Sequence, residues 1–125
     1  MKKILVADDE PGVRALLSAI LSREHERQYE VLFASDGEEA LQMARSEQPD
    51  MVLLDIRMPK MSGHAVCRKL RADSLTSHMG IVMVTALARQ SDRDEAMAAG
   101  ANDLLTKPFT AEAILEKVRE ILGTE

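Results

Sequence analysis

The sequence has little that could form covalent or metal cross-links, because it contains one cysteine, Cys67, and three separated histidines. A single cysteine cannot form an internal disulfide, and the four well-spaced ligands of a closed zinc site are missing. We expect Cys67 to be a small core or surface residue. No apolar run approaches the roughly 20 residues that span a bilayer, and residues 4–7 are too short for a signal peptide. These features predict a cytoplasmic protein without a membrane segment.

The charge of the chain is negative, since 21 acidic and 16 basic residues give a formal net charge of −5 at pH 7. Proteins that bind the phosphate backbone of nucleic acids depend on clustered lysine and arginine, so we expect no direct contact with nucleic acid. With 125 residues, of which 46% are hydrophobic and 30% charged, the composition is that of one globular domain. Residues 1–125 are therefore predicted to form a single domain.

Apolar runs of strand length alternate with amphipathic helical patterns along the chain. The predicted strands cover residues 3–7, 30–34, 52–54, 81–84 and 103–106. The run before Asp55 is apolar throughout, which is typical of a strand buried on both faces of a parallel sheet. The alternation predicts an α/β fold: a single doubly wound, flavodoxin-like sheet of five parallel strands in the order 2-1-3-4-5, with five helices.

The starts of the helices can be placed from residues that favour an N-cap or a first turn. The candidates are Pro11, Ser35 or Asp36, Ser62 with Gly63, Ser91 or Asp92, and Thr110. The first helix should bury its apolar stripe, which consists of Val13, Leu16, Leu17, Ile20 and Leu21. The fourth helix offers only Ala96 and Ala99 to the core before Gly100 ends it, so we expect it to be the least firmly packed.

Polar residues follow four of the five predicted strands: Asp8 with Asp9, Asp55, Thr85 and Lys107. The carboxyl ends of parallel strands lie at one edge of the sheet, where open α/β folds bind their ligands. Taken singly, each residue has a simpler reading as a helix cap, a turn residue or a solvated charge. Their joint placement predicts instead that three carboxylates, a hydroxyl and an ammonium group meet at one site.

Closely packed carboxylates raise each other's pKa unless a cation joins them. Mg²⁺ suits this need because it is a hard ion that prefers oxygen ligands, and Lys107 adds a fixed positive charge. Such a site can transfer a phosphoryl group to a carboxylate, with Asp55 as the nucleophile. The metal, the lysine and the hydroxyl would then stabilise the phosphoryl oxygens.

With these residues in place, the whole chain resembles the receiver domains of two-component response regulators. The matching runs are Asp8-Asp9-Glu10; Leu53-Leu54-Asp55-Ile56-Arg57-Met58-Pro59 with Gly63; Thr85-Ala86; and Gly100-Ala101-Asn102-Asp103 leading to Lys107-Pro108-Phe109. The resemblance implies a phosphorylation-dependent signalling switch rather than a turnover enzyme. Its phosphodonor would be a histidine of a sensor kinase or of a histidine phosphotransfer protein.

The resemblance also assigns a role to each site residue. Asp55 would accept the phosphoryl group, and Thr85 and Lys107 would bind its oxygens. Mg²⁺ would be held by Asp9, Asp55 and the main-chain carbonyl of Arg57, with Asp8 acting largely through water. A further implication is a cis peptide bond before Pro108, which is a sharp expectation because few X-Pro bonds are cis.

The fifth strand departs from the family pattern, because Leu104 stands where an aromatic switch residue is usual. Receiver domains of this kind would signal through the fourth helix, fifth strand and fifth helix. With no ring to swing inward, either backbone and helix shifts carry the signal or the coupling is weaker, and the sequence leaves both open. It also leaves open whether the chain is a stand-alone receiver or part of a longer regulator.

Three histidines and a charged stretch receive no role in the site. His25, His64 and His78 have no partner spacing, and we expect each to be a plain surface residue. Residues 89–95 alternate in charge and predict a solvated helix face, which could also contact an output partner.

Two rival functions fit less well. A magnesium-dependent phosphatase with an aspartate nucleophile usually needs an acid two residues later, where this chain has Arg57. A flavin-binding module would need a phosphate loop rich in serine, threonine or glycine after the first strand. Here, the acids at residues 8–10 would repel a phosphate.

The residue two positions after Thr85 bears on the lifetime of a phosphoryl group, because in receiver domains this position flanks the approach of the attacking water. Leu87 has no polar group to orient that water, so we expect slow self-hydrolysis. Leu87→Glu should shorten the half-life of the phosphorylated chain, which can be followed by the decay of its intact mass. A half-life that does not shorten would contradict this expectation.

Overall fold

The computed structural model of the chain describes residues 1–22, 29–86 and 89–123. Five strands alternate with five helices. In chain order they are β1 (Lys2–Ala7), α1 (Pro11–Leu21), β2 (Tyr29–Ala34), α2 (Gly37–Glu47), β3 (Met51–Asp55), α3 (Gly63–Ala72), β4 (Gly80–Thr85), α4 (Gln90–Ala99), β5 (Asp103–Thr106) and α5 (Ala111–Leu122). The parallel sheet has the order β2-β1-β3-β4-β5, which confirms the predicted fold. Among the described helices, none is both long and apolar enough to cross a membrane.

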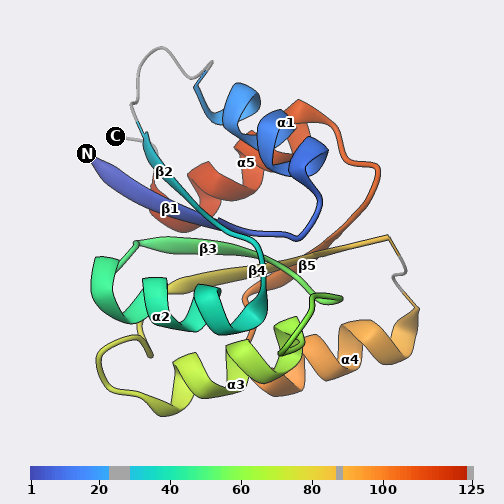
Figure 1. Cartoon of the computed structure of the whole chain (residues 1–125). Helices are drawn as coiled ribbons and strands as arrows, with labels where there is room; N and C mark the ends of the chain where they lie inside the picture. The colour runs from blue at the N-terminus through green and yellow to red at the C-terminus, as the bar shows by residue number, and fades with distance from the viewer. Residues whose placement is uncertain (23–28, 87–88, 124–125) are drawn as a thin grey trace.

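The sheet separates two layers of helices, with α1 and α5 on one face and α2, α3 and α4 on the other (Figure 1). Alternate side chains of β3 enter the two resulting cores. Met51 and Leu53 belong to the cluster beneath α1 and α5, and Val52 and Leu54 to the cluster beneath the other three helices. Every residue of β3 is buried, as its continuous apolar run predicted.

Most helix starts follow the predicted capping chemistry. Pro11 occupies the first turn of α1, and the side chains of Asp36, Ser62 and Thr110 accept hydrogen bonds from backbone amides in α2, α3 and α5. The expected cap of α4 was wrong. This helix starts at Gln90 with Arg89 as its N-cap, and the Asp92 carboxylate accepts from the Arg89 amide at 3.2 Å. An acid at the third helical position can reach back in this way, so it resembles an N-cap in sequence.

Two burial predictions were wrong. Leu16 is 49% exposed, and α1 buries only Leu17, Ile20 and Leu21, because the contact with the sheet is narrower than the apolar stripe. His64, expected at the surface, is 5% exposed in the first turn of α3. Its Nε2 lies 3.5 Å from a Glu95 carboxylate oxygen on α4, so the ring lies where two helices meet. His78 is exposed as expected, and His25 lies outside the described residues.

The edge of the sheet away from Asp55 is held by the guanidinium of Arg71 at the end of α3. It donates to the Gly100 carbonyl at 2.8 Å, to the carbonyls of Ser77 and Met79, and to Asn102 Oδ1. Gly100 has φ of +103°, which is the left-handed C-cap predicted from the sequence. One side chain therefore joins the ends of α3 and α4 to the start of β5.

The start of α3 lies so close to β3 that Gly63 has no room for a side chain. A Cβ there would lie 2.3 Å from the Asp55 carbonyl oxygen, and the Gly63 amide donates to the Ile56 carbonyl at 2.8 Å. Gly63→Ala should therefore lower the free energy of unfolding by about 1–3 kcal/mol, the usual cost of overpacking. Urea denaturation measures this loss.

Gly12→Ala is the matched control, because a Cβ at Gly12 meets no heavy atom within 4 Å. Alanine is favoured over glycine in a helix by roughly 0.5–1 kcal/mol, so this variant should be as stable as the wild type or slightly more stable. Equal losses in the two variants would contradict the close approach at Gly63.

Candidate functional site

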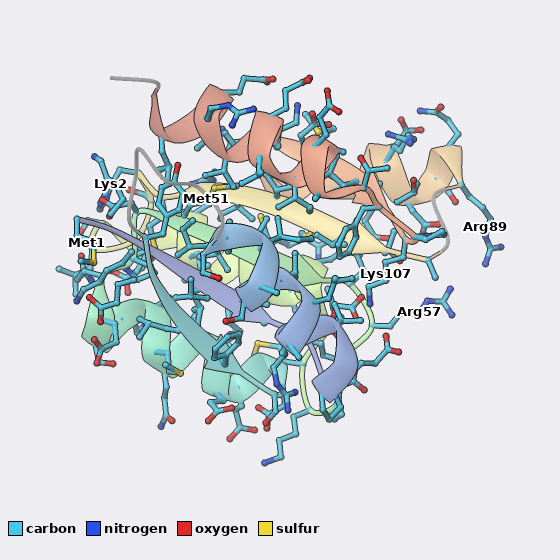
Figure 2. All side chains as sticks on the ribbon, turned by 90° about the horizontal axis from the view of Figure 1, so that it is seen from above. Met1, Lys2, Met51, Arg57, Arg89 and Lys107 are labelled. Atoms are coloured by element: carbon cyan, nitrogen blue, oxygen red, sulfur yellow. The ribbon has the colours of Figure 1, made fainter. Side chains whose placement is uncertain are left out.

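The carboxyl ends of the strands carry the candidate site. Figure 2 shows Lys107, Arg57 and Arg89 at one end of the sheet and Met1, Lys2 and Met51 at the other. The polarity of a parallel sheet produces this separation, because all its strands end on the same side.

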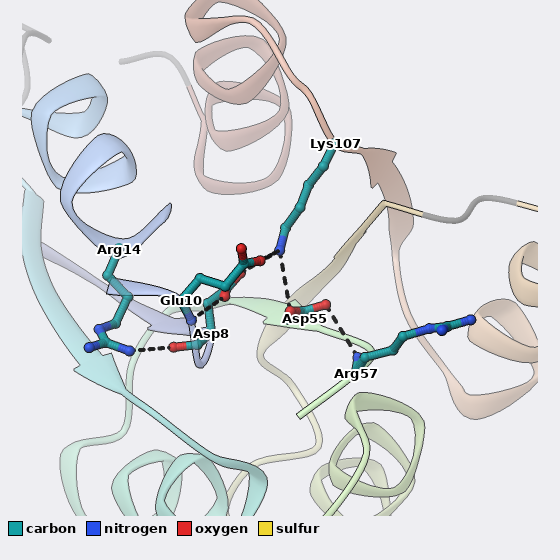
Figure 3. A network of polar contacts seen from close by, with 6 residues as sticks. All are labelled: Asp8, Glu10, Arg14, Asp55, Arg57 and Lys107. Carbon is teal, nitrogen blue, oxygen red and sulfur yellow. Dashed lines mark hydrogen bonds and ion pairs between the residues drawn. The ribbon is translucent and has the colours of Figure 1, made fainter. Parts of the chain in front are cut away.

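Asp8 is fixed by its backbone as well as by its side chain (Figure 3). Its amide donates to the Ala34 carbonyl at 3.0 Å, and its carbonyl accepts from Arg14 Nη1 at 2.7 Å. Its Oδ1 accepts from the Glu10 amide at 2.9 Å, and the residue is only 2% exposed. Residues from β2 and α1 therefore orient this first acid of the site.

Asp55 ends the central strand and is 6% exposed. Its Oδ1 accepts from the Arg57 amide at 3.2 Å, and its Oδ2 accepts from Lys107 Nζ at 3.3 Å. The Arg57 side chain points away from the site and is exposed (Figure 3). Arg57 therefore contacts Asp55 through its backbone.

Lys107 links the acids of β1 and β3. Its Nζ lies 2.9 Å from Asp8 Oδ2, 3.0 Å from Glu10 Oε1 and 3.3 Å from Asp55 Oδ2, and its side chain is 14% exposed. The Lys107 amide donates to the Thr85 carbonyl at 2.8 Å, which fixes the backbone beside β4. The peptide bond between Lys107 and Pro108 is cis, as predicted.

Burial and neighbouring charges shift the pKa values of this group. Burial raises the pKa of Asp55 above its ordinary value, the nearby Asp8 charge raises it further, and Lys107 and the Arg57 amide oppose the shift. Burial alone would lower the pKa of Lys107, but hydrogen bonds to Asp8 and Glu10 and the Asp55 charge raise it above its ordinary value. The ammonium therefore remains protonated at neutral pH.

The acids also form a possible cation site. One carboxylate oxygen from each of Asp8, Asp9, Glu10 and Asp55 lies within 4.8 Å of the other three. Asp8 and Asp55 are buried, whereas Asp9 and Glu10 are exposed. An all-oxygen donor set that is open on one side fits a hard divalent ion such as Mg²⁺, which keeps part of its water shell.

The structure brings the predicted residues to one edge. Asp8, Asp9, Asp55 and Lys107 lie together, and Thr85 is buried at the end of β4 beside them, paired in register with Thr106. Their individual roles stay predictions. Leu87 lies outside the described residues.

The roles of two further residues of the site are not indicated by the sequence. Glu10 belonged to the recognised acidic run, but its contact with Lys107 depends on the direction of a turn that residue types do not determine. Arg14 had no signal of its own, because it acts on a backbone carbonyl.

A family model described as the response regulator receiver domain matches residues 4–119 of the chain. Response regulator PleD of Caulobacter vibrioides is 46% identical over 120 residues, which are 95% of this chain and 26% of that protein. The alkaline phosphatase synthesis transcriptional regulatory protein PhoP of Bacillus subtilis is 42% identical over 97% of this chain and 48% of its own length. The chain thus spans about a quarter to a half of these curated relatives.

Solved structures share the fold over nearly the whole chain. Chemotaxis protein CheY4 of Vibrio cholerae superposes with a TM-score of 0.87 at 32% identity, covering 97% of this chain and 98% of its own. The receiver domain of sensor histidine kinase PA1611 of Pseudomonas aeruginosa has a TM-score of 0.88 at 30% identity, covering 98% of both chains. That structure has a magnesium ion coordinated in its active site cleft.

The raised pKa of Asp55 predicts how stability depends on pH. An acid whose pKa is higher in the folded chain favours folding in its protonated form, so its contribution is lost as the pH rises through the folded-state pKa. Asp55→Asn is neutral at every pH. In metal-free buffer at pH 7, this variant should have a higher free energy of unfolding than the wild type, and the difference should shrink in acid.

Urea denaturation across the acid range measures this difference. Asp94→Asn, on the exposed face of α4, is the matched control for loss of one carboxylate. An Asp55→Asn chain that is less stable than the wild type at pH 7 would show that attraction to Lys107 outweighs the effect of burial.

Proposed function

Because the chain belongs to the response regulator receiver domain family, we propose that it is a switch in which Asp55 accepts a phosphoryl group. The donor would be a histidine of a sensor kinase or of a histidine phosphotransfer protein. The observation that best supports this proposal is the placement of the Asp8 and Asp55 carboxylates within 3.3 Å of one ammonium group at the ligand-binding edge of the sheet.

In the proposed reaction, a carboxylate oxygen of Asp55 attacks the phosphorus of a phosphohistidine. The new O–P bond forms as the N–P bond breaks, and the imidazole leaves with the electron pair and takes up a proton. Lys107 and Thr85 bind phosphoryl oxygens, which is catalysis by positioning and electrostatic stabilisation. No general base is needed, because the attacking group is already a carboxylate.

We assign the magnesium site to Asp9, Asp55 and the main-chain carbonyl of Arg57, with Asp8 acting largely through water. When bound, Mg²⁺ neutralises charge on the phosphoryl oxygens. The clustered oxygens of Asp8, Asp9, Glu10 and Asp55 support this assignment. The hydrogen bond from the Arg57 amide to Asp55 Oδ1 supports it further, because that bond keeps the loop after β3 close to the carboxylate.

The proposed output face consists of α4, β5 and α5. In α4 only Ala96 and Ala99 are buried, and Leu104 of β5 packs in the same core cluster as these alanines. Because Leu104 has no ring to swing, a shift of α4 and β5 would carry the signal, or the coupling would be weaker than with an aromatic residue.

The remaining parts of the proposal concern the chain as a whole. Residues 1–125 would act as one receiver domain in the cytoplasm, where sensor kinases phosphorylate their targets. The chain would catalyse its own phosphorylation without turnover of small molecules. Its net charge of −5 supports a partner other than nucleic acid for this domain.

Incubation with acetyl phosphate and Mg²⁺ tests the proposed function. One labile phosphoryl adduct should appear in the intact mass of the wild type, and Asp55→Asn should abolish it. Chelation of Mg²⁺ with EDTA should also abolish it, because the phosphoryl charge is then not neutralised. Asp94→Asn, which is far from the acidic group in sequence and lies on α4, controls for loss of a carboxylate.

A wild type that takes up no phosphoryl group, or an adduct that persists in Asp55→Asn, would contradict the proposal. Continuous release of phosphate from many phosphate esters would instead indicate a phosphatase.

A further inference from the structure

Lys107 has one more acidic partner than the proposed phosphoryl transfer requires. Asp8 and Asp55 belong to the reacting group, but Glu10 is neither the proposed phosphoryl acceptor nor one of the assigned magnesium ligands. Its carboxylate nevertheless lies 3.0 Å from Lys107 Nζ, closer than the 3.3 Å of Asp55. The Glu10 side chain is 62% exposed, so this contact lies at the rim of the site.

The backbone of Glu10 is fixed at the N-terminus of α1. Its carbonyl accepts from the amides of Val13 and Arg14 at 3.1 and 3.2 Å, and its own amide donates to Asp8 Oδ1 at 2.9 Å. Glu10 occupies the N-cap position, yet its side chain makes no capping hydrogen bond. The carboxylate reaches across the loop to Lys107 instead of accepting a hydrogen bond from a backbone amide in the first turn of α1 (Figure 3).

The contact with Glu10 affects how the Lys107 ammonium can bind a phosphoryl group. Lys107 Nζ donates to Glu10 Oε1 and Asp55 Oδ2, and it forms an ion pair with Asp8 Oδ2. A phosphoryl oxygen on Asp55 would take the place of the Asp55 carboxylate oxygen and would compete with Glu10 and Asp8 for the ammonium group. Glu10 is the acceptor that neither bears the phosphoryl group nor belongs to the assigned magnesium ligands.

We propose that Glu10 is a positioning residue that restrains Lys107 in the unphosphorylated chain and competes with the phosphoryl oxygens for its ammonium group. This inference rests on the proposed function and adds a residue to it. Release of Lys107 from Glu10 accompanies phosphoryl binding. Glu10 therefore slows phosphorylation and shortens the life of the product, because it favours the state in which Lys107 is paired with Glu10.

Glu10→Gln tests this restraint, because the amide keeps the length of the side chain and removes its charge. At saturating Mg²⁺, acetyl phosphate should phosphorylate this variant about two- to fivefold faster than the wild type, the range expected for a partly exposed ion pair. The adduct should also decay more slowly. Glu116→Gln, on the exposed face of α5, removes the same charge without contacting Lys107 and should behave as the wild type.

A double-mutant cycle separates the restraint of Lys107 from simple repulsion between Glu10 and the incoming phosphate. In a Lys107→Met background there is no ammonium to hold, so Glu10→Gln should no longer accelerate phosphorylation. An acceleration of equal size in both backgrounds would show that repulsion alone is responsible, and would overturn the proposal.

A second measurement needs neither metal nor phosphate. In the metal-free chain, solvent exchange of the Lys107 ammonium protons, followed by ¹⁵N NMR, should be at least about twofold faster in Glu10→Gln, because one hydrogen-bond acceptor is weakened. Unchanged exchange would contradict the restraint.

The outcomes distinguish the two proposals. A wild type that is phosphorylated at the same rate as Glu10→Gln would overturn the role of Glu10 and leave the proposed function standing. A wild type that takes up no phosphoryl group would overturn both.

Discussion

The ion pairs of Lys107 with Asp8 and Asp55 hold together a site that its own charges would otherwise disrupt. A parallel sheet brings the ends of β1 and β3 side by side, so two carboxylates that are almost fully buried face the same space. Burial and the nearby Asp8 charge both raise the pKa of Asp55 above its ordinary value. The ammonium from the end of β5 offsets part of this shift, and the backbone hydrogen bond from the Lys107 amide to the Thr85 carbonyl keeps it in place. The charge on Lys107 therefore helps to stabilise the site as well as taking part in the proposed chemistry.

The two edges of the sheet are stabilised by different interactions. At the edge of Asp55, the Lys107 ammonium compensates the charge of the carboxylates. The site remains partly exposed, so a ligand can reach it. At the opposite edge, Arg71 satisfies backbone carbonyls and fixes the C-terminal end of α4 through Gly100. The hydrogen bonds of Arg71 stabilise the edge opposite the site. The ion pairs at the site can therefore exchange partners during the reaction without destabilising that edge.

Much of this arrangement could be predicted from the sequence, because it depends on local patterns. The apolar run of β3, the capping residues Asp36 and Thr110, and the polar residues after the strands all carry their own signals. The details that escaped prediction depend on contacts between distant segments. Glu10 turns toward a lysine 97 positions away, and the buried His64 ring lies 3.5 Å from Glu95 of α4. Such contacts are set by packing and by loop direction, which residue types alone do not specify.

Differences in burial among the helices indicate which helix can be displaced at the lowest cost in free energy. Helix α3 buries Val66 and Leu70, and side chains of this size contribute about 1.5–3 kcal/mol each. Helix α4 buries only two alanines, whose methyl groups contribute roughly 0.8 kcal/mol each. A two-state element responds to a ligand only if the energy difference between its states is comparable to the differential binding energy, which is typically a few kcal/mol. Because moving α4 gives up less buried apolar surface than moving α3, α4 is better matched than α3 to the proposed signal.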